Sequence, residues 1–229
     1  DTITVGQIAN PLVAWQEDLY GFRYVNLTPW NYLSLSSTQQ GASVQGPIKF
    51  GELQYVDYDF GAYNNSSFRA FEQTNTKQVM ARVSLYPMGA KWRFDGLGLT
   101  GFFDYGYGNT TPDFVGSSPL FNAPKAHLTR VAALLHYTAE QWGIAGEWDY
   151  GHNAFTSGNL FSSSGPSSTG PWASVGTLAT ALLNNGRSVQ QGWDVFGHYH
   201  MPNTPFTLFG MFEWFEPNSK VNVNPFDFQ

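Results

Sequence analysis

The chain contains no cysteine, which excludes disulfide bonds and thiolate metal sites. Charge is also scarce: charged residues make up 12% of the 229 residues, against about 25% in typical soluble domains. The net charge of −6 argues against general binding of nucleic acid. No apolar run reaches about 18 residues, the length of a membrane-spanning helix. If the chain crosses a membrane, it therefore does so with strands, because only helices and closed barrels satisfy the backbone in lipid.

Aromatic residues are abundant where charge is scarce, at 17% of the chain. They recur near the ends of segments of about ten residues in which apolar and polar side chains alternate, the pattern of a β-strand. In the segment 142–150, one face carries Glu147 and Asp149, and the other carries Trp142, Ile144, Trp148 and Tyr150. This pattern is typical of an outer-membrane β-barrel, with lipid outside and water inside. A soluble all-β domain that stacks sugars on its aromatics is the alternative.

The alternation predicts about nine antiparallel strands. They are expected near residues 2–8, 36–45, 50–60, 78–87, 97–107, 126–137, 142–152, 191–201 and 206–215. Short turns are expected at Gly46-Pro47, 88–96, 138–141 and 202–205. They alternate with long connections over 9–35, 61–77, 108–125 and 153–190. In outer-membrane barrels the short turns face the periplasm and the long loops face outside.

The polar face of these strands predicts the lining of a water-filled lumen. The residues placed on it are Arg82, Asp104, Arg130, His136, Glu147, Asp149, Asp194, His198 and His200. An arginine facing lipid at the midplane would cost about 2–4 kcal/mol, which a watery lumen avoids. The wet face of a soluble sheet is the alternative. The pattern does not assign a face to Asp57, Asp59 or Glu213.

The connection over 9–35 is too long for a turn and rich in aromatics. Long loops inside compact domains are usually functional. Folded into the lumen, this loop would narrow it, and Glu17, Asp18 and Arg23 would set the field at the constriction. An external loop with ordinary surface charges is the alternative reading.

Sites for metal or catalysis are not predicted. His198 and His200 share one strand face about 6.6–6.8 Å apart, near Asp194, but no third ligand has a diagnostic spacing. We therefore expect no metal and no cofactor. The patterns G-x-S-x-G, H-E-x-x-H and Walker A are missing. Ser84 and His136, the nearest Ser/His pair, both lie on the polar face, so we expect no enzymatic activity.

Four segments carry a resemblance to a known family: Val5-Gly-Gln-Ile-Ala-Asn-Pro11, Glu17-Asp-Leu-Tyr20, Gly192-Trp-Asp-Val-Phe-Gly-His-Tyr199 and Phe206-Thr-Leu-Phe-Gly210. Together they resemble Gram-negative outer-membrane porins, nearest to the phosphate-selective porin O and P type. The resemblance implies a homotrimeric channel for small solutes with an infolded loop. Porins of that type carry many lumen Lys and Arg, whereas this chain has 11 in total.

The sequence thus predicts an all-β fold, an antiparallel transmembrane β-barrel over residues 1–229. About nine strands is an odd count, whereas bacterial single-chain barrels have an even one, so we expect part of a larger barrel of about 16 strands. The predicted function is a porin of the bacterial outer membrane, a passive diffusion channel for small hydrophilic solutes or ions. Its expected partner is the lipid bilayer, not nucleic acid. The alternative is a soluble β-rich carbohydrate-binding module.

Overall fold

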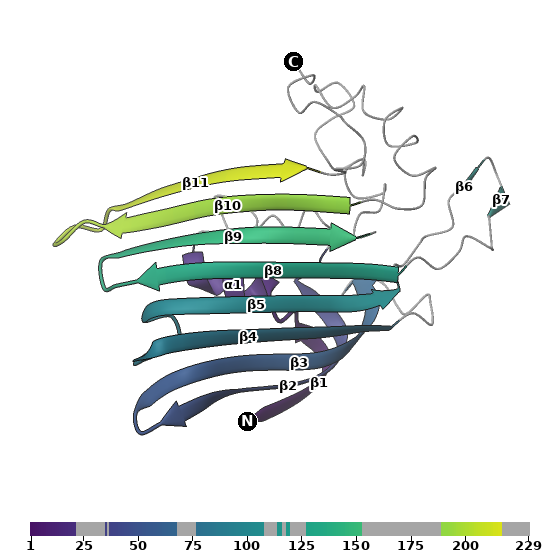
Figure 1. Cartoon of the computed structure of the whole chain (residues 1–229), viewed down its shortest axis with the longest axis horizontal. Helices are drawn as coiled ribbons and strands as arrows, with labels where there is room; N and C mark the ends of the chain where they lie inside the picture. The colour runs from purple at the N-terminus through teal and green to yellow at the C-terminus, as the bar shows by residue number, and fades with distance from the viewer. Residues whose placement is uncertain are drawn as a thin grey trace, which may run out of the picture.

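The computed structural model describes residues 1–21, 35, 37–67, 77–107, 114–115, 118–119, 127–152 and 189–216. In these ranges the chain forms one nine-stranded antiparallel sheet in the order β1-β2-β3-β4-β5-β8-β9-β10-β11 (Figure 1). Its strands are Thr2–Ala9 (β1), Thr38–Phe50 (β2), Leu53–Ser67 (β3), Lys77–Ala90 (β4), Gly96–Tyr107 (β5), His127–Thr138 (β8), Trp142–His152 (β9), Val189–His200 (β10) and Thr207–Glu216 (β11). The expected all-β, antiparallel class is confirmed, with a strand at each expected position.

The sheet is a meander, because each long strand pairs with its neighbours in the chain. Between β5 and β8 lies a separate pair of two-residue strands, β6 (Phe114–Val115) and β7 (Ser118–Pro119). Short turns join β2 to β3, β4 to β5, β8 to β9 and β10 to β11, and all lie at one end of the sheet (Figure 1). The long connections start from the other end. In the described residues β1 and β11 are the two edges, and the sheet is not closed into a ring.

The hairpin between β2 and β3 corrects one expectation. Gly46-Pro47 is not a turn: β2 continues to Phe50, and the turn lies at Gly51, whose φ is 64°. Pro47 lies beyond the first pairing of β1 with β2, between Thr2 and Gln45, so β2 is an edge strand there. Proline is tolerated on edge strands because its missing N–H costs no ladder bond.

One helix, α1 (Val13–Tyr20), follows β1 and lies against one face of the sheet. The Asn10 side chain starts it by accepting hydrogen bonds from the N–H groups of Leu12 and Val13, at 2.9 and 3.2 Å. Gly21 ends it with φ 69° and donates to the Glu17 carbonyl at 3.0 Å. The long connection expected over 9–35 therefore begins with a helix. Within the described ranges, no helix has the length and apolar character to cross a membrane.

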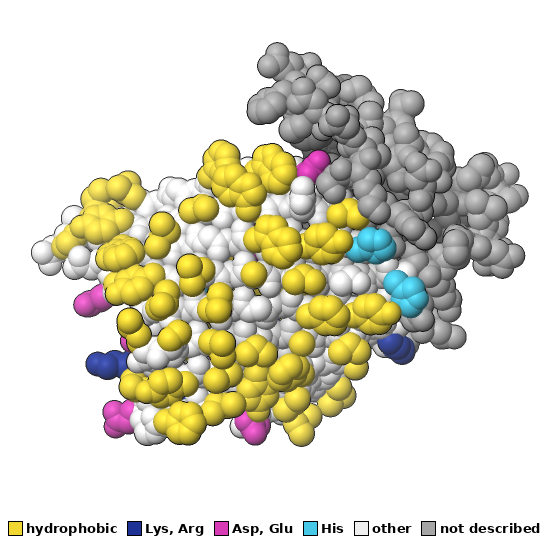
Figure 2. Space-filling view, viewed as in Figure 1, with side chains coloured by type: hydrophobic (Ala, Val, Ile, Leu, Met, Phe, Trp, Pro, Cys, Tyr) yellow, Lys and Arg dark blue, Asp and Glu magenta, His cyan; other side chains and the backbone are white. Residues whose placement is uncertain are grey.

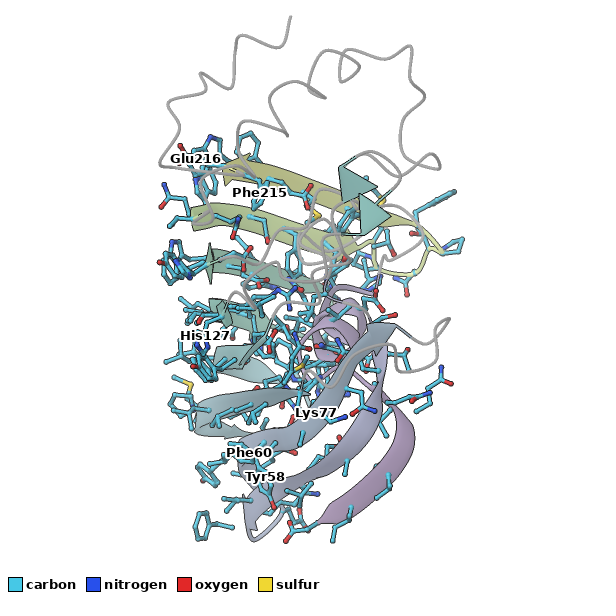
Figure 3. The ribbon with its side chains drawn as sticks, turned by 90° about the vertical axis from the view of Figure 1, so that its right-hand side faces the viewer. Tyr58, Phe60, Lys77, His127, Phe215 and Glu216 are labelled. Atoms are coloured by element: carbon cyan, nitrogen blue, oxygen red, sulfur yellow. The ribbon has the colours of Figure 1, made fainter. Side chains whose placement is uncertain are left out.

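The sheet curves around α1, and we call the side that bears α1 the inner face and the other side the outer face. Figure 3 shows Tyr58, Phe60 and His127 on the side opposite α1. Two buried apolar clusters fill the space under the helix. One gathers residues around Leu12 and Val13 from β1, β3, β4, β5 and β8. The other gathers residues around Trp15, Leu19 and Tyr20 from β8, β9 and β10.

Candidate functional site on the inner face

Two neighbouring rows of residues run across the sheet and differ sharply in chemistry. On the outer face the paired positions from β2 to β11 are Ile48, Val56, Leu85, Leu99, Leu135, Gly146, Val195 and Phe212. The next row lies one residue nearer the long connections on each strand. It belongs to the inner face and consists of Asp57, Ser84, Thr100, Leu134, Glu147, Asp194 and Glu213. Because alternate residues point to opposite faces, the same strands present an apolar row outward and a polar row inward.

The outer face carries exposed hydrophobic side chains across the whole sheet, and its few charged side chains lie near the margins (Figure 2). Aromatic rings lie toward both ends of the strands. Tyr137 and Trp142 stack beside the turn that joins β8 to β9, with ring centroids 5.2 Å apart. Toward the long connections, Trp148 stacks on Tyr150 at 6.1 Å. Trp193 is 43% exposed and contacts Phe212 at 5.2 Å. On the outer face, aromatic rings therefore lie toward both ends of the strands, where the alternating segments of the sequence carry them.

Arg82 of β4 is the centre of a polar network on the inner face. Its guanidinium forms an ion pair with Asp57 at 2.9 Å and donates to Ser84 Oγ and to the Pro11 carbonyl, each at 2.8 Å. Thr100 Oγ1 donates to Ser84 Oγ at 2.8 Å. Arg82 is 1% exposed, so its charge is stabilised by these contacts rather than by bulk water. The network joins β3, β4 and β5 to the start of the helical segment.

A second buried ion pair lies one strand further on. Arg130 Nη1 donates to Asp104 Oδ2 at 2.7 Å, and the two residues face each other directly on β8 and β5. Arg130 is 3% exposed and Asp104 is fully buried. Arg82 and Arg130 are the arginines of the inner face in the described strands, and each contacts a carboxylate.

The other end of the polar row carries three carboxylates side by side. Asp194 of β10 is paired in register with Glu147 of β9 and with Glu213 of β11. Glu147 and Asp194 are 4% and 1% exposed. Both carboxylate oxygens of Asp194 are buried, with no hydrogen-bond partner in the described part of the chain. Asp149 lies two residues from Glu147 on the same face and is also buried.

The helix α1 crosses the inner face and contacts both halves of the row. Gln16 donates a hydrogen bond to Glu147, and the Trp15 ring lies 5.3 Å from the Arg82 guanidinium carbon. At its far end Asp18 forms an ion pair with Arg93, in the turn between β4 and β5, at 2.9 Å. Burial raises the pKa of the Tyr20 hydroxyl above its usual range, and neighbouring Glu17 and Asp194 raise it further. Because Asp18 reaches the turn between β4 and β5, α1 runs from the long-connection end of the sheet toward the short-turn end.

Most residues predicted from the sequence to line a lumen lie on the inner face. Arg82, Asp104, Arg130, His136, Glu147, Asp149 and Asp194 are all buried there. His136 lies among aromatic rings, with Trp15, Tyr86 and Phe94 at 5.8, 6.1 and 6.3 Å.

The remaining predicted residues differ in their surroundings. His198 and His200 follow the alternation onto the inner face, and their rings lie 5.2 Å apart near the turn end, where His200 is exposed. Gly143 leaves room for His198, since a Cβ there would lie 2.7 Å from His198 Cε1. Across the described ranges, no group of three or more acidic or histidine side chains is arranged to hold a metal ion. Glu17 and Asp18 belong to α1, and Arg23 lies outside the described residues.

Some residues of this face could not be placed from the sequence. Asp57, Asp59 and Glu213 are inner-face residues, whose register becomes clear only through pairing with neighbouring strands. Gln16 and Trp15 were missed because their role depends on partners far away in the chain, Glu147 and Arg82. The aromatic content of 9–35 was the available signal for this contact with the sheet.

The geometry defines a curved antiparallel sheet with an apolar outer face, a charged inner face and a helix against that inner face. Comparison with protein-family models, with curated proteins and with solved structures gives no match.

Proposed function

We propose that this protein is a porin of the bacterial outer membrane, a passive diffusion channel for small hydrophilic solutes or ions. The observation that carries the proposal is the inverted distribution of side chains on the strands. Leu99, Leu135 and Ile144 are 48%, 54% and 51% exposed on the outer face, whereas Arg82, Asp104 and Asp194 are buried on the inner face. A lipid-facing exterior and a polar interior give transmembrane strands this pattern.

Energetics support lipid as the solvent of the outer face. A soluble monomer rarely exposes a contiguous apolar patch larger than about 300–600 Å². Here one apolar row alone continues without a charged residue from Ile48 on β2 to Phe212 on β11. In a bilayer this surface needs no partner protein. Aromatic rings near both strand ends fit the two membrane interfaces.

A bilayer also requires the sheet edges to be paired. An unsatisfied backbone group in lipid costs several kcal/mol, so an open edge is not stable there. β1 and β11 both run from the short-turn end to the long-connection end. We therefore propose that an odd number of further strands, whichever chain supplies them, joins β11 back to β1 in a larger barrel of about 16 strands.

Within such a barrel α1 would be the constriction. It occupies the inner face and is anchored at Arg82, Glu147 and Arg93, so it would leave a narrowed passage beside it. The same observation favours a second candidate, a structural barrel whose lumen is closed by α1. A homotrimer remains a prediction of the resemblance to porins.

Fractionation and conductance test the proposal. The natural protein should sediment with outer membranes, require detergent for extraction and migrate differently on gels before and after heating. Reconstituted in planar bilayers, it should give stepwise single-channel currents. Membrane location without current would favour the closed barrel. A protein that is soluble without detergent would contradict both, and binding to insoluble polysaccharide would then favour the carbohydrate-binding module.

A further inference from the structure

The inner face is closed in its middle. On β8 and β9 every residue that points inward is buried, from Leu128 to Thr138 and from Gly143 to Gly151. The inward residues of β4 from Gln78 to Tyr86 and of β5 from Gly98 to Gly106 are buried as well. A solute in a water-filled lumen therefore does not reach these four strands.

The closure comes from packing between the helical segment and the sheet. Leu12 and Val13 are fully buried in the cluster that joins them to the strands. Trp15 contacts Phe94, in the turn between β4 and β5, with ring centroids 5.4 Å apart. Protein interiors are packed as densely as organic crystals, which leaves no passage for a solute. A passage through the lumen must therefore run on the other side of α1.

The ion pairs of the polar row lie inside the closed part. Arg82 and Arg130 are 1% and 3% exposed, and they contact Asp57 and Asp104 at 2.9 and 2.7 Å. The two guanidinium charges are therefore balanced within the protein and shielded from the lumen. Such pairs hold neighbouring strands together rather than meet a passing solute.

The inner face opens at β11. Each inward residue of this strand is partly exposed, namely Thr207, Phe209, Met211, Glu213 and Phe215. Phe209 and Met211 also pack against the buried cluster that contains Tyr20, so they stand beside α1 while part of their surface stays accessible. The Phe209 ring stacks on the Tyr20 ring with centroids 6.3 Å apart. β11 and α1 therefore meet at an accessible part of the inner face.

The opposite edge of the sheet is open on the same side. Thr2 and Thr4 of β1 and Gln45 of β2 point inward, and all three are exposed or partly exposed. The further strands proposed above would join β11 to β1. The two open flanks would then border one passage, with α1 as its third side.

We propose that solutes pass between α1 and the strands that join β11 to β1, and that Phe209 and Met211 set the width of this passage. The inference rests on the proposed porin function and identifies the wall at which that channel selects solutes by size. It also assigns the buried ion pairs of Arg82 and Arg130 a structural role, outside the path of the solute.

Single cysteines test the inference on the natural full-length protein in planar bilayers. These 229 residues contain no cysteine, and any cysteine elsewhere in the natural protein is replaced by serine. Met211→Cys places a thiol on the proposed wall. Phe212→Cys is the matched control, because Phe212 is the next residue of β11 and is 59% exposed on the outer face. Ala132→Cys places a thiol in the closed part, where Ala132 is 2% exposed.

A membrane-impermeant methanethiosulfonate that carries a sulfonate group forms a mixed disulfide with an accessible thiolate and adds a bulky anion there. The Met211→Cys channel should lose most of its current on this treatment and recover it when a reducing agent releases the group. The Phe212→Cys and Ala132→Cys channels should keep their current.

The outcomes separate the two proposals. Heat-modifiable migration first establishes that each variant is folded. A folded native protein that passes no current would overturn the porin function and the inference with it. Conducting Met211→Cys channels whose current the reagent leaves unchanged would overturn the inference alone. An equal loss of current in Ala132→Cys or Phe212→Cys would also overturn it, since the passage would then reach the closed part or the effect would not arise on the inner face.

Discussion

Arg82 shows at the scale of one residue how the inner face holds its charges. Its guanidinium has contacts with β3, β4 and the backbone before α1 in a fully buried position. Removing one partner of a buried ion pair costs more than the pair contributes, because the other charge is left uncompensated. Asp57 would be that remaining charge, with the half-exposed Arg93 as its nearest cation at 3.9 Å.

We therefore expect Arg82→Gln to lower the free energy of unfolding by about 3–5 kcal/mol. Lys49→Gln is the matched control, because Lys49 is exposed near the end of β2 and such surface substitutions usually change the free energy of unfolding by less than about 0.5 kcal/mol. Urea unfolding followed by tryptophan fluorescence in detergent measures both. Similar losses for the two variants would mean that Arg82 is not a structural centre.

The outer face permits a residue-scale test of the solvent that surrounds it. Ala133 lies outward in the middle of β8, and Ala139 lies in the short turn after it. In a bilayer, Ala133→Arg should cost about 2–4 kcal/mol, against about 0–1 for Ala139→Arg near the interface. The fraction of heat-modifiable protein recovered from membranes reports the difference. If the sheet face were in water, both arginines would be tolerated equally.

At the scale of elements, α1 is the feature that decides between an open and a closed interior. Replacing Val13–Tyr20 with a flexible Gly/Ser segment of equal length removes the helix and its contacts with Glu147 and Arg93. Single-channel conductance should rise, because the helix occupies the inner face. A folded variant with native conductance would place the constriction elsewhere.

The elements also show how much of the fold can be predicted from the sequence. Alternation alone places the inner and outer faces of β4, β5, β8, β9 and β10, because a half-buried strand must repeat every second residue. It fails near β2 and β3, where Gly46-Pro47 has the composition of a turn but lies in an edge segment of β2. It also misses α1, since an eight-residue helix takes its stability from tertiary contacts rather than from its own sequence.

The candidate site was predictable to a similar degree. Seven of the nine residues placed on the polar face are buried on the inner face, namely Arg82, Asp104, Arg130, His136, Glu147, Asp149 and Asp194. The alignment of Glu147, Asp194 and Glu213 was not predictable, because it depends on the register between β9, β10 and β11 rather than on any one strand.

For the whole molecule, the proposed membrane location and the separation of short turns from long connections together predict an orientation. The absence of cysteine makes single-cysteine labelling clean. In intact cells a membrane-impermeant maleimide should label Ser164→Cys, in the long connection, and not Glu140→Cys, in a short turn. Both should react after the cells are opened. Labelling of Glu140→Cys in intact cells would reverse the orientation.

The meander has a consequence for the order in which the molecule folds. Its strands pair with chain neighbours, and such local topologies form quickly. The helix is different: Gln16 meets Glu147 across 131 residues, and Arg82 meets Pro11 across 71. The sheet up to β9 must therefore be in place before α1 can dock fully. The docking of α1 is then the last step of folding and the first to reverse. Amide hydrogens of α1 should therefore exchange well before those of β8, through a local opening that leaves the sheet intact.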